Sequence, residues 1–282
     1  MSITIAKRLD QIGDLPTVPH TMQRVLSEIQ EVSSSAQSLQ KVIEQDPVIT
    51  AKILQMSNSV YYSPKTEISS VARAIVTMGF KRIRDLVISI SLTGMFCEDL
   101  GYPEFQSKEL WLHAIGVGVG AQLIAKKVPG LDPDDLFTAG MLHDLGRLVY
   151  CLHFYTELGE ALEEVKTAGV SLNQAEENLG LTHAEIGAYL AKRWKLSELL
   201  VSVIRYHHHP NDAGEYAQAA AAVNLADSLA KYLQIGWSGM GEKPGVKIPK
   251  ALGLDVETVK VLAQQLKDEK EKIIESWGDI IS

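Results

Sequence analysis

Apolar residues recur every three to four positions along almost the whole chain, which is the spacing of one face of an α-helix. Met22, Val25, Leu26 and Ile29 are an example near the N-terminus. Alternating apolar and polar residues, which would indicate a strand, never continue for more than a few positions. We therefore predict an all-α fold.

Start and stop signals divide this pattern into two series of helices, which flank an interruption at 101–107 that contains Tyr102-Pro103. The first series is expected at 21–31, 38–44, 47–58, 69–78 and 80–96. The second series is expected at 109–128, 135–154, 156–167, 172–179, 182–194, 197–208 and 215–233. Residues 235–250 are rich in glycine and proline and predict a loop, and the charged stretch 256–277 predicts a peripheral helix.

The predicted elements suggest three parts of the chain. An N-terminal helical lobe is expected over 1–105 and a second helical lobe over 106–235. A loop and the C-terminal peripheral helix are expected over 236–282.

The composition favours a globular protein and argues against several other classes. Hydrophobic residues make up 46% of the 282 positions, which is enough for a sizeable core and excludes a mainly disordered chain. The net charge is −8 and no dense Lys/Arg run occurs, so there is no strong signal for nucleic-acid binding. The longest near-apolar stretch, 86–96, is too short to span a bilayer. With no secretory signal and no CxxC around Cys97 or Cys151, we expect a cytoplasmic protein without membrane association.

Titratable side chains occupy apolar, core-facing positions in the second lobe. These residues are His113, His143, Asp144, His183, His207, His208 and Asp227. A buried polar group without a partner costs about 1–3 kcal/mol, so we expect the set to converge on a metal ion. Imidazole and carboxylate ligands suit iron, manganese, zinc or nickel, and the sequence does not distinguish among these divalent ions.

Several alternatives stay open for individual residues. The whole set could be a hydrogen-bonded network without metal. His207 and His208 are about 100° apart on a helix, so both face inward only if the helix ends there. Asp227 could instead cap a helix or pair with a lysine. Glycines would let the helices approach closely enough to converge, and they stand at positions 116, 120, 140, 146 and 187.

The ordered set resembles the HD superfamily of metal-dependent phosphohydrolases, and most closely its regulatory branch, the HDOD family. The second lobe carries the matching segments AGMLHDLG at 139–146, THAEIG at 182–187 with Trp194, and HHHP at 207–210. The first lobe carries Asp46-Pro47, Leu54, Asn58-Ser59, ISSV at 68–71, RAI at 73–75 and Gly79. The resemblance covers roughly residues 13–235.

The resemblance implies a two-lobe module of bacterial signal transduction that acts through signalling proteins as partners. By analogy with HD enzymes, one metal ion would be held by His113, His143, Asp144 and Asp227. Asp144 would bridge to a second ion, held by His183, His207 and His208. Asp144 and Arg147 are the candidate catalytic residues if the protein is an enzyme.

Two other functions remain open: a phosphohydrolase or phosphodiesterase acting on a nucleotide or cyclic dinucleotide, and a nucleotide sensor without hydrolysis. Catalytic relatives with a Gly-Tyr-Pro signature usually carry lysine where this chain has Arg147, and arginine is a poor proton shuttle because it stays charged. After His208 the chain continues through Pro210-Asn-Asp-Ala-Gly and lacks that signature. These departures favour a regulatory role.

Overall fold

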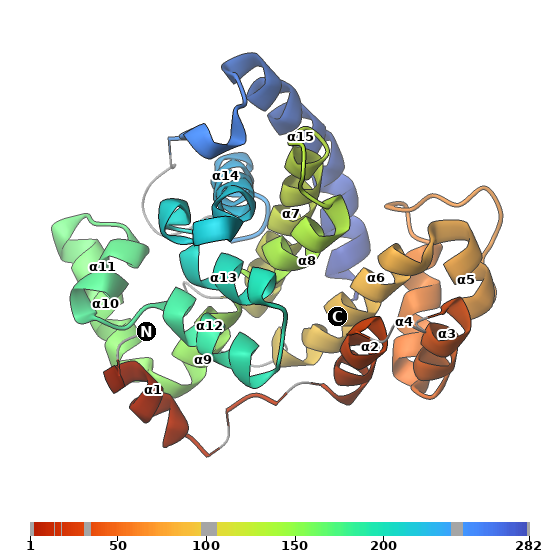
Figure 1. Ribbon diagram of the computed structural model, residues 1–282, viewed down its shortest axis with the longest axis horizontal. Helices are drawn as coiled ribbons and strands as arrows, with labels where there is room; N and C mark the ends of the chain where they lie inside the picture. The colour runs from red at the N-terminus through yellow and green to blue at the C-terminus, as the bar shows by residue number, and fades with distance from the viewer. Residues whose placement is uncertain are drawn as a thin grey trace.

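The computed structural model describes residues 3–13, 15–17, 19–30, 35–96, 106–237 and 245–280. Within these ranges every regular element is helical and no strand occurs, which confirms the predicted all-α class. The helices form two groups (Figure 1). We call α2–α6 the first helical group and α7–α14 the second helical group.

The first helical group begins with local signals that the sequence makes visible. Asp46 caps the helix that starts at Pro47, because its carboxylate accepts from the N–H groups of Val48 and Ile49. Gly79 separates the last two helices with a φ of 92°, a conformation that favours glycine. The helices are α2 (His20–Gln30), α3 (Ala36–Glu44), α4 (Pro47–Ser57), α5 (Val71–Met78) and α6 (Phe80–Leu92), followed by the 3-10 turn η1 (Thr93–Phe96).

The second helical group surrounds α7, most of whose residues are buried. Its helices are α7 (Ser107–Ala125), α8 (Pro133–Leu142), α9 (Leu145–His153), α10 (Tyr155–Ala168), α11 (Leu172–Leu179), α12 (His183–Arg193), α13 (Glu198–Tyr206) and α14 (Ala217–Leu233). Two 3-10 turns, η2 (Pro210–Asp212) and η3 (Gly214–Tyr216), connect the last two helices. Thr182 starts α12 as predicted, since its hydroxyl accepts from the Glu185 N–H.

The single helix predicted over 135–154 is wrong, because α8 and α9 are separate helices that meet at His143 and Asp144. Asp144 leaves the helical conformation, with φ −97° and ψ 14°. Both helices are buried along most of their length, so the apolar pattern continues across the break. The predicted helix 197–208 likewise ends early, at Tyr206. Cys97 lies outside the described residues.

An N-terminal helix that the apolar pattern did not predict, α1 (Ile3–Asp10), packs on the second helical group. The Tyr189 hydroxyl of α12 donates to the Asp10 carboxylate, and the Trp194 indole donates to the carbonyl of Pro16 over 3.1 Å. The lobe boundary predicted between residues 105 and 106 assigns α1 and Pro16 to the first lobe, whereas the contacts described above join them to the second helical group. The boundary between the two lobes stays a prediction.

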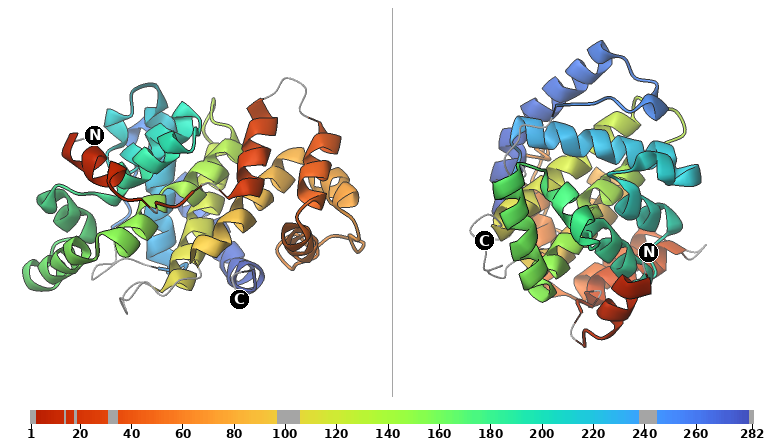
Figure 2. Two further views of the ribbon diagram at one scale, coloured as in Figure 1. Left: turned by 90° about the horizontal axis from the view of Figure 1, so that it is seen from below. Right: turned by 90° about the vertical axis from the view of Figure 1, so that its left-hand side faces the viewer.

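The predicted C-terminal helix is present as α15 (Val256–Gly278), after the 3-10 turn η4 (Lys250–Leu252). It packs along α7, where the rings of Trp277 and Trp111 lie 6.1 Å apart. The residues just after α15 also contact the first helical group, because Lys52 of α4 donates to the carbonyl of Ile280 over 2.6 Å. Figure 2 shows this end of the chain between the two groups. Among the described helices, none has both the length and the apolar composition that crossing a bilayer requires.

Candidate metal centre

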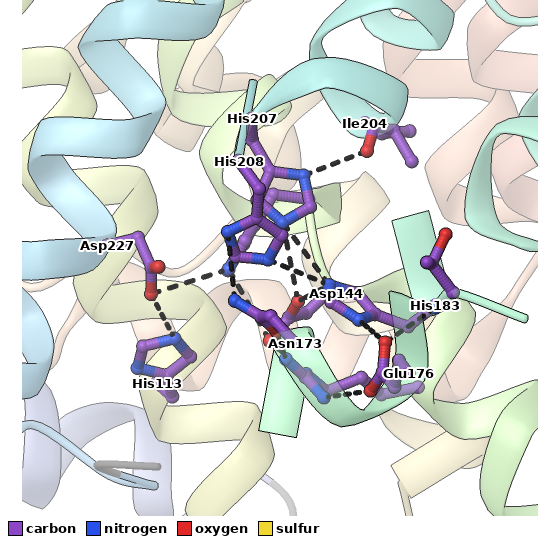
Figure 3. A network of polar contacts seen from close by, with 12 residues as sticks. His113, Asp144, Asn173, Glu176, His183, Ile204, His207, His208 and Asp227 are labelled. Atoms are coloured by element: carbon purple, nitrogen blue, oxygen red, sulfur yellow. Dashed lines mark hydrogen bonds and ion pairs between the residues drawn. The ribbon is translucent and has the colours of Figure 1, made fainter. Parts of the chain in front are cut away.

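The seven predicted ligand residues converge in the interior of the second helical group, and all of them except His143 are labelled in Figure 3. Their ligand atoms form two sets. We call His113, His143 and Asp227 the His113 cluster, and Asp144, His183, His207 and His208 the His183 cluster. The seven residues come from α7, the turn between α8 and α9, the start of α12, the turn after α13, and α14.

Two glycines bring Asp144 and His183 together. A Cβ added to Gly146 would lie 1.9 Å from the carbonyl oxygen of His183, and one added to Gly187 would lie 3.0 Å from the amide nitrogen of Gly146. The crossing of α9 and α12 therefore requires the absence of both side chains. The sequence predicted this role for both positions.

The His113 cluster has ligand atoms but no hydrogen bonds among them. His113 Nε2 lies 3.1 Å from Asp227 Oδ1, and His143 Nε2 lies 3.9 Å from the same oxygen. All three residues are buried. Within the described part of the chain, none of these three atoms has a hydrogen-bond partner. Since each unpartnered buried atom costs about 1–3 kcal/mol, the set fits a cation.

Each carboxylate of the centre has one oxygen held by a fixed cation. Asp227 Oδ2 accepts from the Lys231 ammonium over 2.7 Å, and Asp144 Oδ2 accepts from Arg147 Nε over 2.8 Å. The other oxygen of each group, Oδ1, faces the imidazoles. Asp227 thus combines a lysine pair with an inward-facing oxygen.

The His183 cluster is built around one nitrogen. His183 Nε2 lies 3.1 Å from Asp144 Oδ1, 3.3 Å from His207 Nε2 and 3.1 Å from His208 Nε2. Both His207 and His208 reach it because α13 ends at Tyr206. The condition that the sequence left open, an early end of this helix, is therefore met.

The outer nitrogens of three histidines are bound to protein acceptors. The Nδ1–H of His143 donates to the carbonyl of Gly140 over 2.6 Å, and that of His207 donates to the carbonyl of Ile204 over 2.8 Å. His183 Nδ1 contacts the Glu176 carboxylate. A neutral imidazole that donates from Nδ1 keeps its lone pair on Nε2, which is the state that binds a metal ion.

Sequence reasoning missed Glu176 and Asn173, both on α11. Glu176 is 0% exposed; its Oε2 accepts from the His183 backbone N–H over 2.9 Å and its Oε1 accepts from Arg147 over 3.0 Å. Asn173 lies between Arg147 and His208. The one signal for Glu176 was its place four residues after Leu172, on the apolar face of the helix.

Burial keeps most of the imidazoles neutral. It lowers the pKa of His143 to about 4 and holds the pKa values of His207 and His208 well below their ordinary value. Burial also lowers the pKa of His183, but the Glu176 and Asp144 carboxylates outweigh it, and the pKa lies above its ordinary value.

The two carboxylates stay ionised despite their burial. Burial alone would raise both pKa values, but Arg147 holds the pKa of Asp144 well below its ordinary range. Lys231 does the same for the pKa of Asp227. Neutral imidazoles beside ionised carboxylates are the protonation state that a divalent cation requires.

Acidification from about pH 7.5 to about pH 5 is expected to destabilise the metal-free protein. Unfolded histidines titrate near 6.5, whereas His143, His207 and His208 titrate lower when folded. The unfolded state therefore binds more protons, and the free energy of unfolding falls by at most about 1.4 kcal/mol per pH unit for each residue.

His183 contributes with the opposite sign, since its raised pKa adds stability that is complete below about 6.5 and is lost at higher pH. Burial also raises the pKa of Asp85 to about 7 and the pKa of Asp135 above its ordinary value, so both carboxyls, like His183, add stability on acidification. The three histidines with lowered pKa values outweigh these groups, and a net loss of stability is expected. Urea unfolding of metal-free protein at the two pH values measures it. Greater stability at the lower pH would contradict the prediction.

A pocket of about 240 Å³ reaches the His183 cluster, with Asn173, His183 and His208 in its lining. Two further basic side chains line it, and both are paired with carboxylates. Arg205 lies 3.6 Å from Glu185, and His209 lies 2.7 Å from Glu177.

Comparisons with known proteins identify similar chains. The family described as HDOD domain matches residues 15–210. An uncharacterized protein of Treponema pallidum (strain Nichols) is 27% identical over 256 residues, which cover 86% of this chain and 46% of that protein. The chain thus spans about half the length of this curated relative.

Two crystal structures resemble the whole chain. An HDOD domain protein with unknown function from Geobacter sulfurreducens is 27% identical, with a TM-score of 0.83 over 98% of this chain and 97% of the other. A protein from Shewanella amazonensis SB2B, which is named as a candidate phosphohydrolase, is 25% identical to this chain. The TM-score is 0.76 over 98% of each chain.

Proposed function

The chain belongs to the HDOD family, and from this premise we propose that it is a metal-bearing regulatory module of bacterial signal transduction that acts through protein partners in the cytoplasm. The main support for a bound metal ion is the His113 cluster, whose three facing ligand atoms are buried without hydrogen-bond partners among the described residues. A divalent ion there would be held by His113, His143 and Asp227. When bound, it would supply positive charge that ties α7, α14 and the α8–α9 turn together.

Two features support regulation over hydrolysis. Arg147 is fully paired, with Asp144, Glu176 and Asn173 each accepting from a different nitrogen, so it is a fixed structural cation. The pocket beside the His183 cluster is lined by basic side chains that already face carboxylates. A nucleotide phosphate would need cations that are not already neutralised.

A metal-dependent phosphohydrolase is the alternative with a specific observation in its favour. The pocket extends to His183 and His208, so a phosphoryl group could reach the centre. The likeness to the Shewanella protein supports the same alternative. A sensor that binds a nucleotide or cyclic dinucleotide without turnover would use the same pocket.

Metal content tests the proposal directly. Protein purified without a histidine tag or chelator is expected to hold at least about one equivalent of iron, manganese, zinc or nickel by elemental analysis. His143→Ala is expected to lose the ion bound by the His113 cluster, because it removes a buried ligand. His209→Ala is the matched control, since His209 is 59% exposed and pairs with Glu177. Equal metal in His143→Ala and wild type would rule out this assignment.

Hydrolysis of a generic phosphodiester distinguishes the proposed regulatory module from the phosphohydrolase, and ligand binding without hydrolysis identifies the sensor. Metal-loaded protein is expected to leave bis(p-nitrophenyl) phosphate intact. Turnover that disappears in His143→Ala would select the phosphohydrolase. Calorimetric binding of a nucleotide or cyclic dinucleotide without product would select the sensor.

A further inference from the structure

We infer that Asn173 makes His208 a hydrogen-bond donor instead of a metal ligand, so that the chain binds one ion and not two. This rests on the proposed metal centre and concerns its second half, the His183 cluster. The family resemblance implied that His208 is a metal ligand in this cluster. The contacts of His208 instead indicate that its Nε2 atom, which would have to bind the metal, carries the proton.

The orientation of Asn173 follows from its contact with Arg147. The Arg147 guanidinium donates to Asn173 Oδ1 over 2.9 Å. Arginine has only donors, so the amide oxygen must face it and the amide nitrogen must face the other way. Arg147 is itself fixed by Asp144 and Glu176, and its guanidinium lies 4.8 Å from the centre of the Trp237 ring.

The amide nitrogen of Asn173 lies 3.1 Å from His208 Nδ1 (Figure 3). Since the amide nitrogen donates, His208 Nδ1 accepts, and the single proton of the neutral imidazole stands on Nε2. His208 Nε2 is the atom that faces the cluster, 3.1 Å from His183 Nε2. A protonated nitrogen has no lone pair for a metal ion. His143 and His207 differ, because their Nδ1 atoms face carbonyl oxygens.

The two clusters therefore differ in the ligand atoms that are available to bind an ion. The His113 cluster has three buried ligand atoms without hydrogen-bond partners in the described part of the chain, whereas Asp144 Oδ1 is in that position alone among the four ligand atoms of the His183 cluster. In the His183 cluster, His208 turns an N–H toward His183, so a second ion would have to displace that proton and break the contact with Asn173.

Asn173→Asp tests the inference. The new carboxylate still accepts from Arg147, and its second oxygen accepts from His208 Nδ1, which moves the proton to Nδ1 and leaves a lone pair on Nε2. Metal bound per chain, measured by elemental analysis after reconstitution with zinc and desalting, is expected to rise from about one to about two equivalents. Wild type with one equivalent and Asn173→Asp with two supports the inference.

Two further variants separate the imidazole from the added charge. His208→Ala alone is expected to keep the single wild-type equivalent, and His208→Ala combined with Asn173→Asp is expected to lose the second. Loss of the single equivalent in His208→Ala would overturn the inference, as would a second equivalent that persists in the double variant.

The proton on His208 can also be read in the metal-free wild type. Long-range ¹H–¹⁵N NMR distinguishes the two neutral forms of imidazole, and we expect the form protonated at Nε2. The form protonated at Nδ1 would overturn the inference even if Asn173→Asp does not fold. Two equivalents in wild type would overturn this inference and leave the proposed metal centre standing. No bound metal in wild type would contradict the proposed function itself.

Discussion

The Arg147→Met variant is expected to lose about 3–5 kcal/mol of folding free energy, measured by urea unfolding of the metal-free protein at neutral pH. Arg147 is 3% exposed, and its guanidinium donates to Asp144 over 2.8 Å and to Glu176 over 3.0 Å. Methionine fills a similar volume but leaves both carboxylates buried without this cation. An uncompensated buried charge is far more costly than the loss of a surface ion pair.

Arg205→Met is the matched control for this variant. The Arg205 side chain is 25% exposed and lies 3.6 Å from Glu185, so its removal is expected to cost less than about 1 kcal/mol. Similar losses for the two variants would show that Arg147 does not neutralise the buried carboxylates. Far-UV circular dichroism before unfolding checks that both variants start from a folded state.

Gly146→Ala is expected to destabilise the protein by about 3 kcal/mol or more and to lower its metal content. The added Cβ would stand 1.9 Å from the carbonyl oxygen of His183, and the neighbouring atoms belong to backbone that no side-chain rotation relieves. α9 and α12 would have to separate, which would draw Asp144 away from His183. The melting temperature and elemental analysis of the same sample measure both effects.

Gly94→Ala is the control for the loss of a glycine. A Cβ at Gly94 would have no heavy atom within 4 Å, so the melting temperature is expected to stay close to that of wild type. A Gly146→Ala variant as stable as Gly94→Ala would mean that the close crossing of α9 and α12 is not required for folding.

Most helices of this chain could be predicted from the sequence because their signals are local. Asp46 and Thr182 cap helices at the predicted positions, and Gly79 ends one. The exceptions also have a physical reason. The break at His143 and Asp144 was hidden because α8 and α9 are both buried, so no polar face marks where one ends and the other begins.

The chemical identity of the candidate centre was equally visible in the sequence. Imidazoles and carboxylates at apolar positions had to find partners, and their order resembled a known family. Glu176 and Asn173 gave no comparable signal, because α11 resembles an ordinary amphipathic surface helix. The assignment of metal ligands remains a prediction that elemental analysis tests.

By itself, the sequence determined the helical class, most helix ends and the residue types that meet in the core. These depend on spacing of a few residues, which the chain carries locally. Only the tertiary structure decided which atoms face one another. Arg147, Asn173 and His208 lie on separate segments, yet their contacts decide which nitrogen of His208 carries the proton. That choice depends on how α9, α11 and the end of α13 pack, because a hydrogen bond forms only within about 3 Å and no local pattern encodes such a distance.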